Sequence, residues 1–168
     1  NSPAYWDTSK EPTKTQYDLF QKHDGFGEAE YRELCDYTHA KGMDFTSTPF
    51  DYASADYLYD MVDFYKISSS DLSNIPFIKH IGGKGKPVYM SVGASYLSEV
   101  DEAVRALKDS GCSDIVILHC ILSYPTKPND ANLRVIETLK KDFPDVRVGF
   151  SDHVTPDDTM MTLAAAYL

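Results

Sequence analysis

Apolar residues follow two patterns along the chain, short continuous runs and longer segments with helical spacing. Residues 114–120, DIVILHC, form a nearly unbroken apolar run that predicts a buried strand. Residues 96–112 place apolar side chains at 97, 100, 103, 104 and 107, the spacing of one helix face. On these criteria the sequence predicts five strands, at 44–50, 63–71, 86–93, 114–120 and 146–153. It predicts helices at 27–42, 52–61, 72–85, 96–112, 133–143 and 157–168, with a helical turn near 16–22.

The regular alternation of strands and helices is typical of a parallel sheet covered by helices. A doubly wound sheet and a (β/α)8 barrel both have this pattern, but no GxGxxG motif follows any predicted strand, which argues against a dinucleotide-binding sheet. Every predicted strand ends in polar residues, and in a barrel all these ends face one mouth. We therefore expect an α/β fold, a partial (β/α)8 TIM barrel. The polar strand-end residues are Thr46, Ser47, Thr48, Lys66, Ser68, Ser69, Ser70, Asp71, Ser91, His119, Ser151, Asp152 and His153.

Charge and cysteine content narrow the classes of partner. The net charge of −10 would repel a phosphate backbone, so we expect no nucleic acid. No apolar run is long enough to span a bilayer, so we expect no membrane partner. The three cysteines form no CxxC pair and suit a reducing compartment better than a disulfide scaffold, so we expect a cytoplasmic protein.

Lys66 lies within an apolar strand pattern and is followed by three serines. Burying a lysine there costs several kcal/mol unless an anion pairs with it. The ammonium group either reaches the rim of the sheet, or forms a cradle for phosphate or carboxylate with Ser69, Ser91 and Ser151. A third interpretation is a Schiff-base amine, and the residues alone leave these roles open.

Two further residues have both a chemical and a structural interpretation. A lone histidine is more often packed in a core or at a rim than used as a ligand, but His153 ends the last predicted strand beside Asp152, a position that strengthens the case for a ligand. One histidine is too few for a metal site, so other ligands would come from outside the chain, or from water and substrate. Asp71 suits a general base or an acceptor of a sugar hydroxyl, and equally a carboxylate stabilised at a helix N-terminus.

Four stretches occur in the order and spacing of the sialic acid synthase family, which contains N-acetylneuraminate synthase and the synthases of legionaminic and pseudaminic acid. They are YKISSSDLSNIPFIKHI, GKPVYMSVGAS, DIVILHCILSYPTKPNDANLRVI and VGFSDH. The leading SPAYWD, EPT, QYDLF and STPFD also resemble that family. The resemblance covers essentially the whole chain. It implies that residues 1–168 are an incomplete TIM-barrel catalytic domain with strands three to seven, and that the other strands and a C-terminal antifreeze-like domain lie outside them.

The family's reaction condenses phosphoenolpyruvate with an N-acetylated aldose such as N-acetylmannosamine, giving a nonulosonic acid and phosphate with the help of a divalent metal, manganese or magnesium. The resemblance implies Lys66, Asp71 and His153 as catalytic residues. By the same resemblance Thr48, Lys66, Ser69, Ser91 and Ser151 hold phosphoenolpyruvate, Asp71 and Tyr124 lie at the sugar, and His153 binds the metal. We expect phosphoenolpyruvate and the aldose as partners, and a homodimer for the full-length protein.

One departure from the family pattern concerns the acceptor sugar. Ile121 and Leu122 stand between HC and YP, where the family usually carries small polar residues. Three alternatives stay open. A ketodeoxyoctonate phosphate synthase-like enzyme would need two basic clusters for two phosphates, and only one is apparent, around Lys66. The others are a Schiff-base aldolase using Lys66 and an inactive barrel that serves as a binding subunit.

Overall fold

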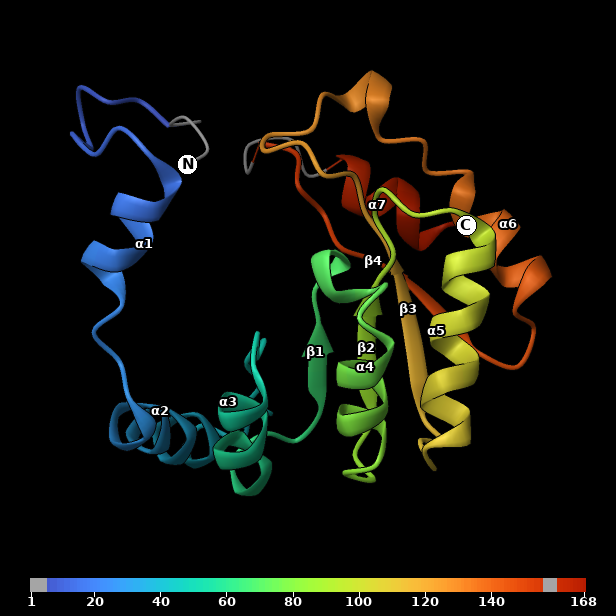
Figure 1. Ribbon diagram of the computed structural model, residues 1–168. Coiled ribbons are helices and arrows are strands. Elements are labelled where there is room, and N and C mark those ends of the chain that lie inside the picture. The colour runs from blue at the N-terminus through green and yellow to red at the C-terminus, as the bar shows by residue number, and fades with distance from the viewer. Residues whose placement is uncertain (1–5, 156–159) are drawn as a thin grey trace.

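Four short parallel strands form one sheet in the computed structural model, which describes residues 6–155 and 160–168 (Figure 1). The strands are β1 (Tyr65–Ile67), β2 (Val88–Ser91), β3 (Ile115–His119) and β4 (Arg147–Phe150). Their order in the sheet is their order in the sequence, and each neighbouring pair is parallel. The predicted α/β fold with a parallel sheet is therefore confirmed.

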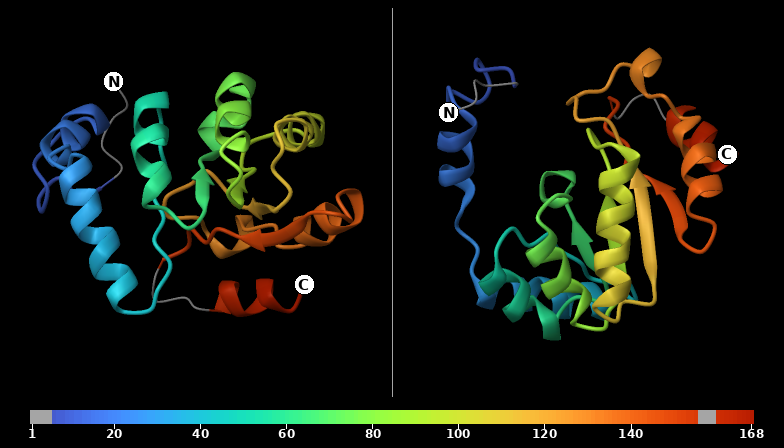
Figure 2. Two further views of the ribbon diagram at one scale, coloured as in Figure 1. Left: turned by 90° about the horizontal axis from the view of Figure 1, so that it is seen from below. Right: turned by 45° about the vertical axis from the view of Figure 1, so that its right-hand side comes forward.

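Helices α4, α5 and α6 connect successive strands, α1 to α3 precede β1, and α7 follows β4. Helices α3, α4 and α5 lie side by side along one face of the sheet (Figure 2). In sequence order the helices are α1 (Gln16–His23), α2 (Glu28–Ala40), α3 (Tyr52–Tyr57), α4 (Ile75–Gly82), α5 (Leu97–Asp109), α6 (Val135–Asp142) and α7 (Met160–Ala166). Three 3-10 turns, η1 (Leu58–Asp60), η2 (Ser69–Asp71) and η3 (Pro128–Asp130), interrupt the connections. Residues 157–159 of the last predicted helix lie outside the described residues. No helix in the described part is both long and apolar enough to cross a membrane.

Helix α5 illustrates how the local sequence specifies these elements. The carboxylate of Glu99 in its first turn accepts a hydrogen bond of 2.7 Å from the backbone N–H of Tyr96, which satisfies one of the unpaired donors at the helix start. Val100, Val104 and Leu107 form a buried stripe at helical spacing. This stripe packs α5 onto the sheet beside α4.

The two faces of the sheet differ in burial. Tyr65 and Ile67 of β1 are almost completely buried in the core, whereas Lys66 between them points to the opposite, half-covered face. Lys66 and Tyr89 are register partners, so both side chains lie on that face. In Figure 1 the strands run upward, and the loops that follow them gather at one end of the sheet. Polar side chains on the half-covered face can therefore meet at that end.

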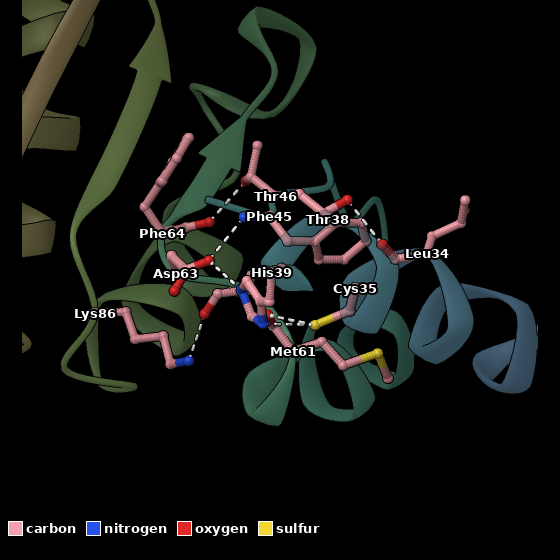
Figure 3. Close-up of polar contacts among 11 residues, drawn as sticks. Leu34, Cys35, Thr38, His39, Phe45, Thr46, Met61, Asp63, Phe64 and Lys86 are labelled. Carbon is pink, nitrogen blue, oxygen red and sulfur yellow. Dashed lines mark hydrogen bonds and ion pairs between the residues drawn. The ribbon is translucent and has the colours of Figure 1, made fainter. Parts of the chain in front are cut away.

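The predicted strand at 44–50 is wrong, because this segment contains no strand. It lies beside β1, where the backbone N–H of Asp63 donates to the carbonyl of Phe45 at 2.8 Å. The other contacts use side chains: Asp63 Oδ2 accepts from the N–H of Phe45 and Thr46 Oγ1 donates to the carbonyl of Phe64, both at 2.7 Å (Figure 3). Side chains thus occupy the positions that a regular ladder would need, and the sheet ends at β1.

Candidate functional site

The ammonium group of Lys66 lies at the carboxyl end of the sheet, half-buried on its less covered face. Its Nζ donates to the hydroxyl Oγ of Ser91 at 2.6 Å and to the carbonyl of Ile67 at 3.0 Å. Within the described residues no carboxylate forms an ion pair with it. Burial lowers the pKa of Lys66, and the nearby Cys120 raises it by less. A desolvated cation without a counter-ion is suited to bind an anion.

Two more strand ends meet beside this lysine. The hydroxyl of Ser69, in η2, accepts a hydrogen bond of 3.0 Å from the backbone N–H of Gly93 and lies 3.2 Å from Sγ of Cys120. Gly93 has to be glycine for this approach, since a Cβ there would stand 2.7 Å from Sγ of Cys120. We call Lys66, Ser69, Ser91, Gly93 and Cys120 the Lys66 cluster. It combines one cation with two hydroxyls from the ends of neighbouring strands, as a phosphate or carboxylate site does.

A second group lies at the end of β4. The Nδ1 of His153 is 2.5 Å from the carbonyl of Ile121, and its Nε2 is 3.4 Å from Oγ of Ser151. The ring of Tyr124 covers the imidazole, with 4.2 Å between centroids. We call these four residues the His153 cluster. It is joined to the Lys66 cluster through the chain itself, because Ile121 directly follows Cys120.

The hydrogen bond of His153 decides its tautomer. A carbonyl oxygen can only accept, so Nδ1 carries a hydrogen, and in the neutral imidazole Nε2 then has the free lone pair. This is the arrangement in which a histidine binds a metal, and His153 therefore fits one position of a divalent metal site. Across residues 6–155 and 160–168 no group of three His, Cys, Asp or Glu side chains is placed to hold a metal ion. A metal ion bound at His153 would need its other ligands from outside these residues.

Two other predicted site residues, Ser151 and Thr48, form no hydrogen bond to the Lys66 cluster in the described residues. Ser151 turns its hydroxyl to His153 and forms no hydrogen bond with Lys66. Thr48 lines a pocket of about 290 Å³ with Tyr31 and Asp51, and within the described residues it forms no hydrogen bond to the Lys66 cluster. Their roles at phosphoenolpyruvate stay predictions.

Asp71 follows Ser69 and Ser70 in η2, close to the Lys66 cluster in sequence. Its Oδ2 is buried and has no hydrogen-bond partner in the described part of the chain. A buried acceptor without a donor is uncommon in proteins, because the lost hydration is not replaced. The carboxylate therefore suits a donor from a ligand or from a segment outside these residues.

Sequence reasoning missed two members of the Lys66 cluster, Gly93 and Cys120. Each is the last residue of a predicted strand, 86–93 or 114–120, which was the only available signal. His39 is an exposed residue of α2 whose contact with another element no local pattern indicates. The structure pairs His39 Nε2 with Asp63 Oδ2 at 2.7 Å, while its Nδ1 lies 3.5 Å from Sγ of Cys35 (Figure 3). The spacing of Cys35 and His39 indicates a shared helix face, but Asp63 comes from another element.

Comparison with known proteins identifies the family of this chain. The NeuB family model matches residues 1–168. The chain is 34% identical over 152 residues to N-acetylneuraminate-9-phosphate synthase of Homo sapiens, covering 88% of this chain and 41% of that protein. It is 38% identical over 120 residues to N,N'-diacetyllegionaminic acid synthase of Campylobacter jejuni, covering 68% of this chain and 36% of that protein. The chain thus spans less than half the length of these curated relatives.

A solved structure of a sialic acid synthetase has a similar fold. The N-acetylneuraminic acid (sialic acid) synthetase of Leptospira borgpetersenii serovar Hardjo-bovis superposes with a TM-score of 0.82 at 31% identity, over 94% of this chain and 55% of that one. The α/β fold is one in which ligands bind at the carboxyl ends of parallel strands. Within that fold class, the chain belongs to the NeuB family, the sialic acid synthases.

Proposed function

We propose that this chain provides the phosphoenolpyruvate-binding part of an enzyme that condenses phosphoenolpyruvate with an N-acetylated aldose, such as N-acetylmannosamine, to a nonulosonic acid and phosphate. The observation that carries the proposal is Lys66. Its ammonium group is desolvated, is held by Ser91, and has no carboxylate partner in the described residues. A small multiply charged anion supplies the missing counter-charge.

In this proposal the Lys66 cluster binds and orients the donor. Lys66 and the hydroxyls of Ser69 and Ser91 hold its anionic groups, and Thr48 and Ser151 complete the pocket. Holding the donor in line with the aldehyde supplies much of the rate, because the reacting atoms meet without further loss of freedom. The methylene carbon then bonds to the aldehyde carbon, whose oxygen takes up a proton. Water adds at the adjacent carbon of the donor, and the C–O bond to phosphate breaks.

The His153 cluster lies at the acceptor side. Nε2 of His153 would be one ligand of a manganese or magnesium ion, which when bound polarises the sugar aldehyde. The carbonyl of Ile121 keeps the imidazole in the tautomer that binds metal. Asp71 offers its unpartnered oxygen, and Tyr124 its exposed ring, to the sugar.

Leu122 bears on which sugar is bound. Its side chain is 50% exposed at the same end of the sheet and cannot donate or accept a hydrogen bond. The neighbouring Ser123 does not supply a hydrogen bond to the sugar in its place, because its hydroxyl already donates to the carbonyl of Pro125. We propose an acceptor that presents a methyl or deoxy carbon to Leu122, as a deoxygenated diacetamido sugar does.

The same proposal extends to the architecture of the whole protein. The sequential strand order and the half-covered sheet face support a (β/α)8 barrel, of which residues 1–168 are one incomplete part. The remaining strands and an antifreeze-like domain would lie outside it, and the full-length protein would form a homodimer. A cytoplasmic location belongs to the proposal as well, since all three cysteines are free thiols.

The test is phosphoenolpyruvate binding to the full-length protein, measured by titration calorimetry. Lys66→Ala should weaken binding about ten- to a hundredfold, the effect of losing a charge-assisted contact. Lys79→Ala, which removes an exposed lysine of α4, is the matched control and should leave the dissociation constant unchanged. Equal affinity in both variants would contradict the assignment of Lys66.

One observation favours a second candidate. An amine whose pKa is lowered by burial also suits Schiff-base chemistry, so a Schiff-base aldolase using Lys66 remains the alternative. Borohydride reduction in the presence of pyruvate distinguishes the two. A stable adduct on Lys66 would replace the first proposal, whereas unmodified protein that binds phosphoenolpyruvate supports it.

A further inference from the structure

Cys120 differs from the other cysteines in what its thiol contacts. Cys35 reaches the carbonyl of Met61 at 3.3 Å, and Cys112 reaches that of Asp114 at 3.5 Å. Cys120 is 2% exposed, and its Sγ lies 3.2 Å from the hydroxyl of Ser69. Within the described residues this hydroxyl is the polar partner of the sulfur.

The hydrogen bonds of Ser69 limit what the pair can do. A serine hydroxyl has one hydrogen to donate and two lone pairs to accept with, and the N–H of Gly93 already occupies one lone pair. If Ser69 donates to the sulfur of Cys120, it has no hydrogen left for a ligand. If Cys120 donates its S–H to Ser69 instead, the second lone pair is filled and the hydroxyl hydrogen remains available.

We propose that Cys120 is a positioning residue for the anionic donor: its thiol donates to Ser69 and thereby directs the Ser69 hydroxyl hydrogen to an oxygen of phosphoenolpyruvate. This inference rests on the proposed function. The placement of the sulfur supports it, since only the missing Cβ of Gly93 leaves room for Sγ at that point. Gly93 and Cys120 thus hold Ser69 from two sides, and the ligand receives the one remaining hydrogen.

The experiment is a double-mutant cycle in the full-length protein, with the dissociation constant of phosphoenolpyruvate as the readout. Cys120→Ala should weaken binding about three- to tenfold, the value of one neutral hydrogen bond. Cys120→Ser keeps a donor of similar size and should retain most of the affinity. In a Ser69→Ala background, Cys120→Ala should have no further effect, because its partner is already gone. Cys112→Ala, at another buried thiol, is the matched control and should leave the affinity unchanged.

The outcomes separate the two proposals. Wild-type protein that binds phosphoenolpyruvate, with no change in Cys120→Ala, would overturn the role of Cys120 alone. If Cys120→Ala weakened phosphoenolpyruvate binding equally in the wild-type and the Ser69→Ala backgrounds, the role of Cys120 would also be overturned, because such a loss indicates a general packing defect. Wild-type protein that does not bind phosphoenolpyruvate would overturn both. The KM for the aldose is measured in parallel, and it should stay constant if Cys120 acts through Ser69.

Discussion

Lys66 donates a hydrogen bond of 2.6 Å from Nζ to Oγ of Ser91, although its register partner in β2 is Tyr89. The lysine side chain therefore extends along the sheet by two residues and brings its charge to the carboxyl end of the strands. There the ammonium group also donates to the carbonyl of Ile67, in a position where burial lowers its pKa.

The lowered pKa of Lys66 predicts how phosphoenolpyruvate binding depends on pH. The ammonium group loses its proton below the usual lysine value of about 10.4, and the anion needs the charged form. The affinity for phosphoenolpyruvate should therefore fall as pH rises through the lowered pKa of Lys66. This fall should begin at a lower pH than it would for an exposed lysine. Binding in this pH range should also take up a proton, because the anion favours the charged amine. Calorimetry in two buffers of different ionisation enthalpy measures that uptake.

Lys66→Arg is the control for this pH dependence. A guanidinium group remains charged throughout the accessible range, so this variant should show no loss of affinity in the same alkaline window. A wild-type profile as flat as that of Lys66→Arg throughout the alkaline range would show that Lys66 does not carry the pH dependence.

Gly93→Ala should damage the Lys66 cluster. The added Cβ would stand 2.7 Å from Sγ of Cys120, closer than real Cβ atoms come to a neighbour, and 3.1 Å from its carbonyl oxygen, which is tighter than most real contacts. We expect a loss of about 1–3 kcal/mol in the free energy of unfolding, together with weaker phosphoenolpyruvate binding. Gly25→Ala is the control, because nothing lies within 4 Å of a Cβ at that position. Denaturant unfolding and calorimetry on the two variants test this, and matching behaviour would argue against a crowded site.

His153→Ala should weaken manganese binding to the full-length protein at least about tenfold, since even residues that only support a metal ligand contribute that much. His23→Ala removes an exposed histidine of α1 and should have no effect. Direct titration with manganese, followed by electron paramagnetic resonance, measures affinity independently of turnover. Equal affinity in both variants would exclude His153 as a ligand.

The pairing of Asp63 with His39 predicts a pH-dependent contribution to stability. The hydrogen bond from His39 and that from the N–H of Phe45 lower the pKa of Asp63. A carboxylate with a lowered folded-state pKa stabilises the fold above its unfolded value of about 3.9, and this contribution is lost as pH falls through the folded pKa. Asp63→Asn should cost about 1 kcal/mol of unfolding free energy at pH 7, a small value because the pair is partly exposed.

The difference between Asp63→Asn and wild type should disappear at low pH, where both side chains are neutral. Urea unfolding at several pH values measures it. Asp145→Asn is the comparison, because it removes another carboxylate whose pKa is lowered, in a surface pair with Lys108. It should change the free energy of unfolding by less. A constant difference at every pH would mean that packing and not the charge of Asp63 is responsible.

Much of this protein could be predicted from the sequence because its signals are local. The apolar run at 115–119 and the helical spacing at 97–109 determine a buried strand and an amphipathic helix wherever they stand, and their alternation leads to a parallel sheet. The alternation of side chains between the two faces of β1 is also determined locally. With Tyr65 and Ile67 on the core side, Lys66 has to point to the other face.

The tertiary structure decided what no local pattern contains. Residues 44–50 resemble a strand, yet the side chains of Thr46 and Asp63 take the hydrogen bonds that a ladder would need. Cys120 joins the site because Gly93, in the loop after β2, leaves space for its sulfur. The tautomer of His153 depends on the carbonyl of Ile121, which is far from it in sequence. Hydrogen bonds and steric fit act between atoms within a few ångströms, and only the folded chain determines which atoms these are.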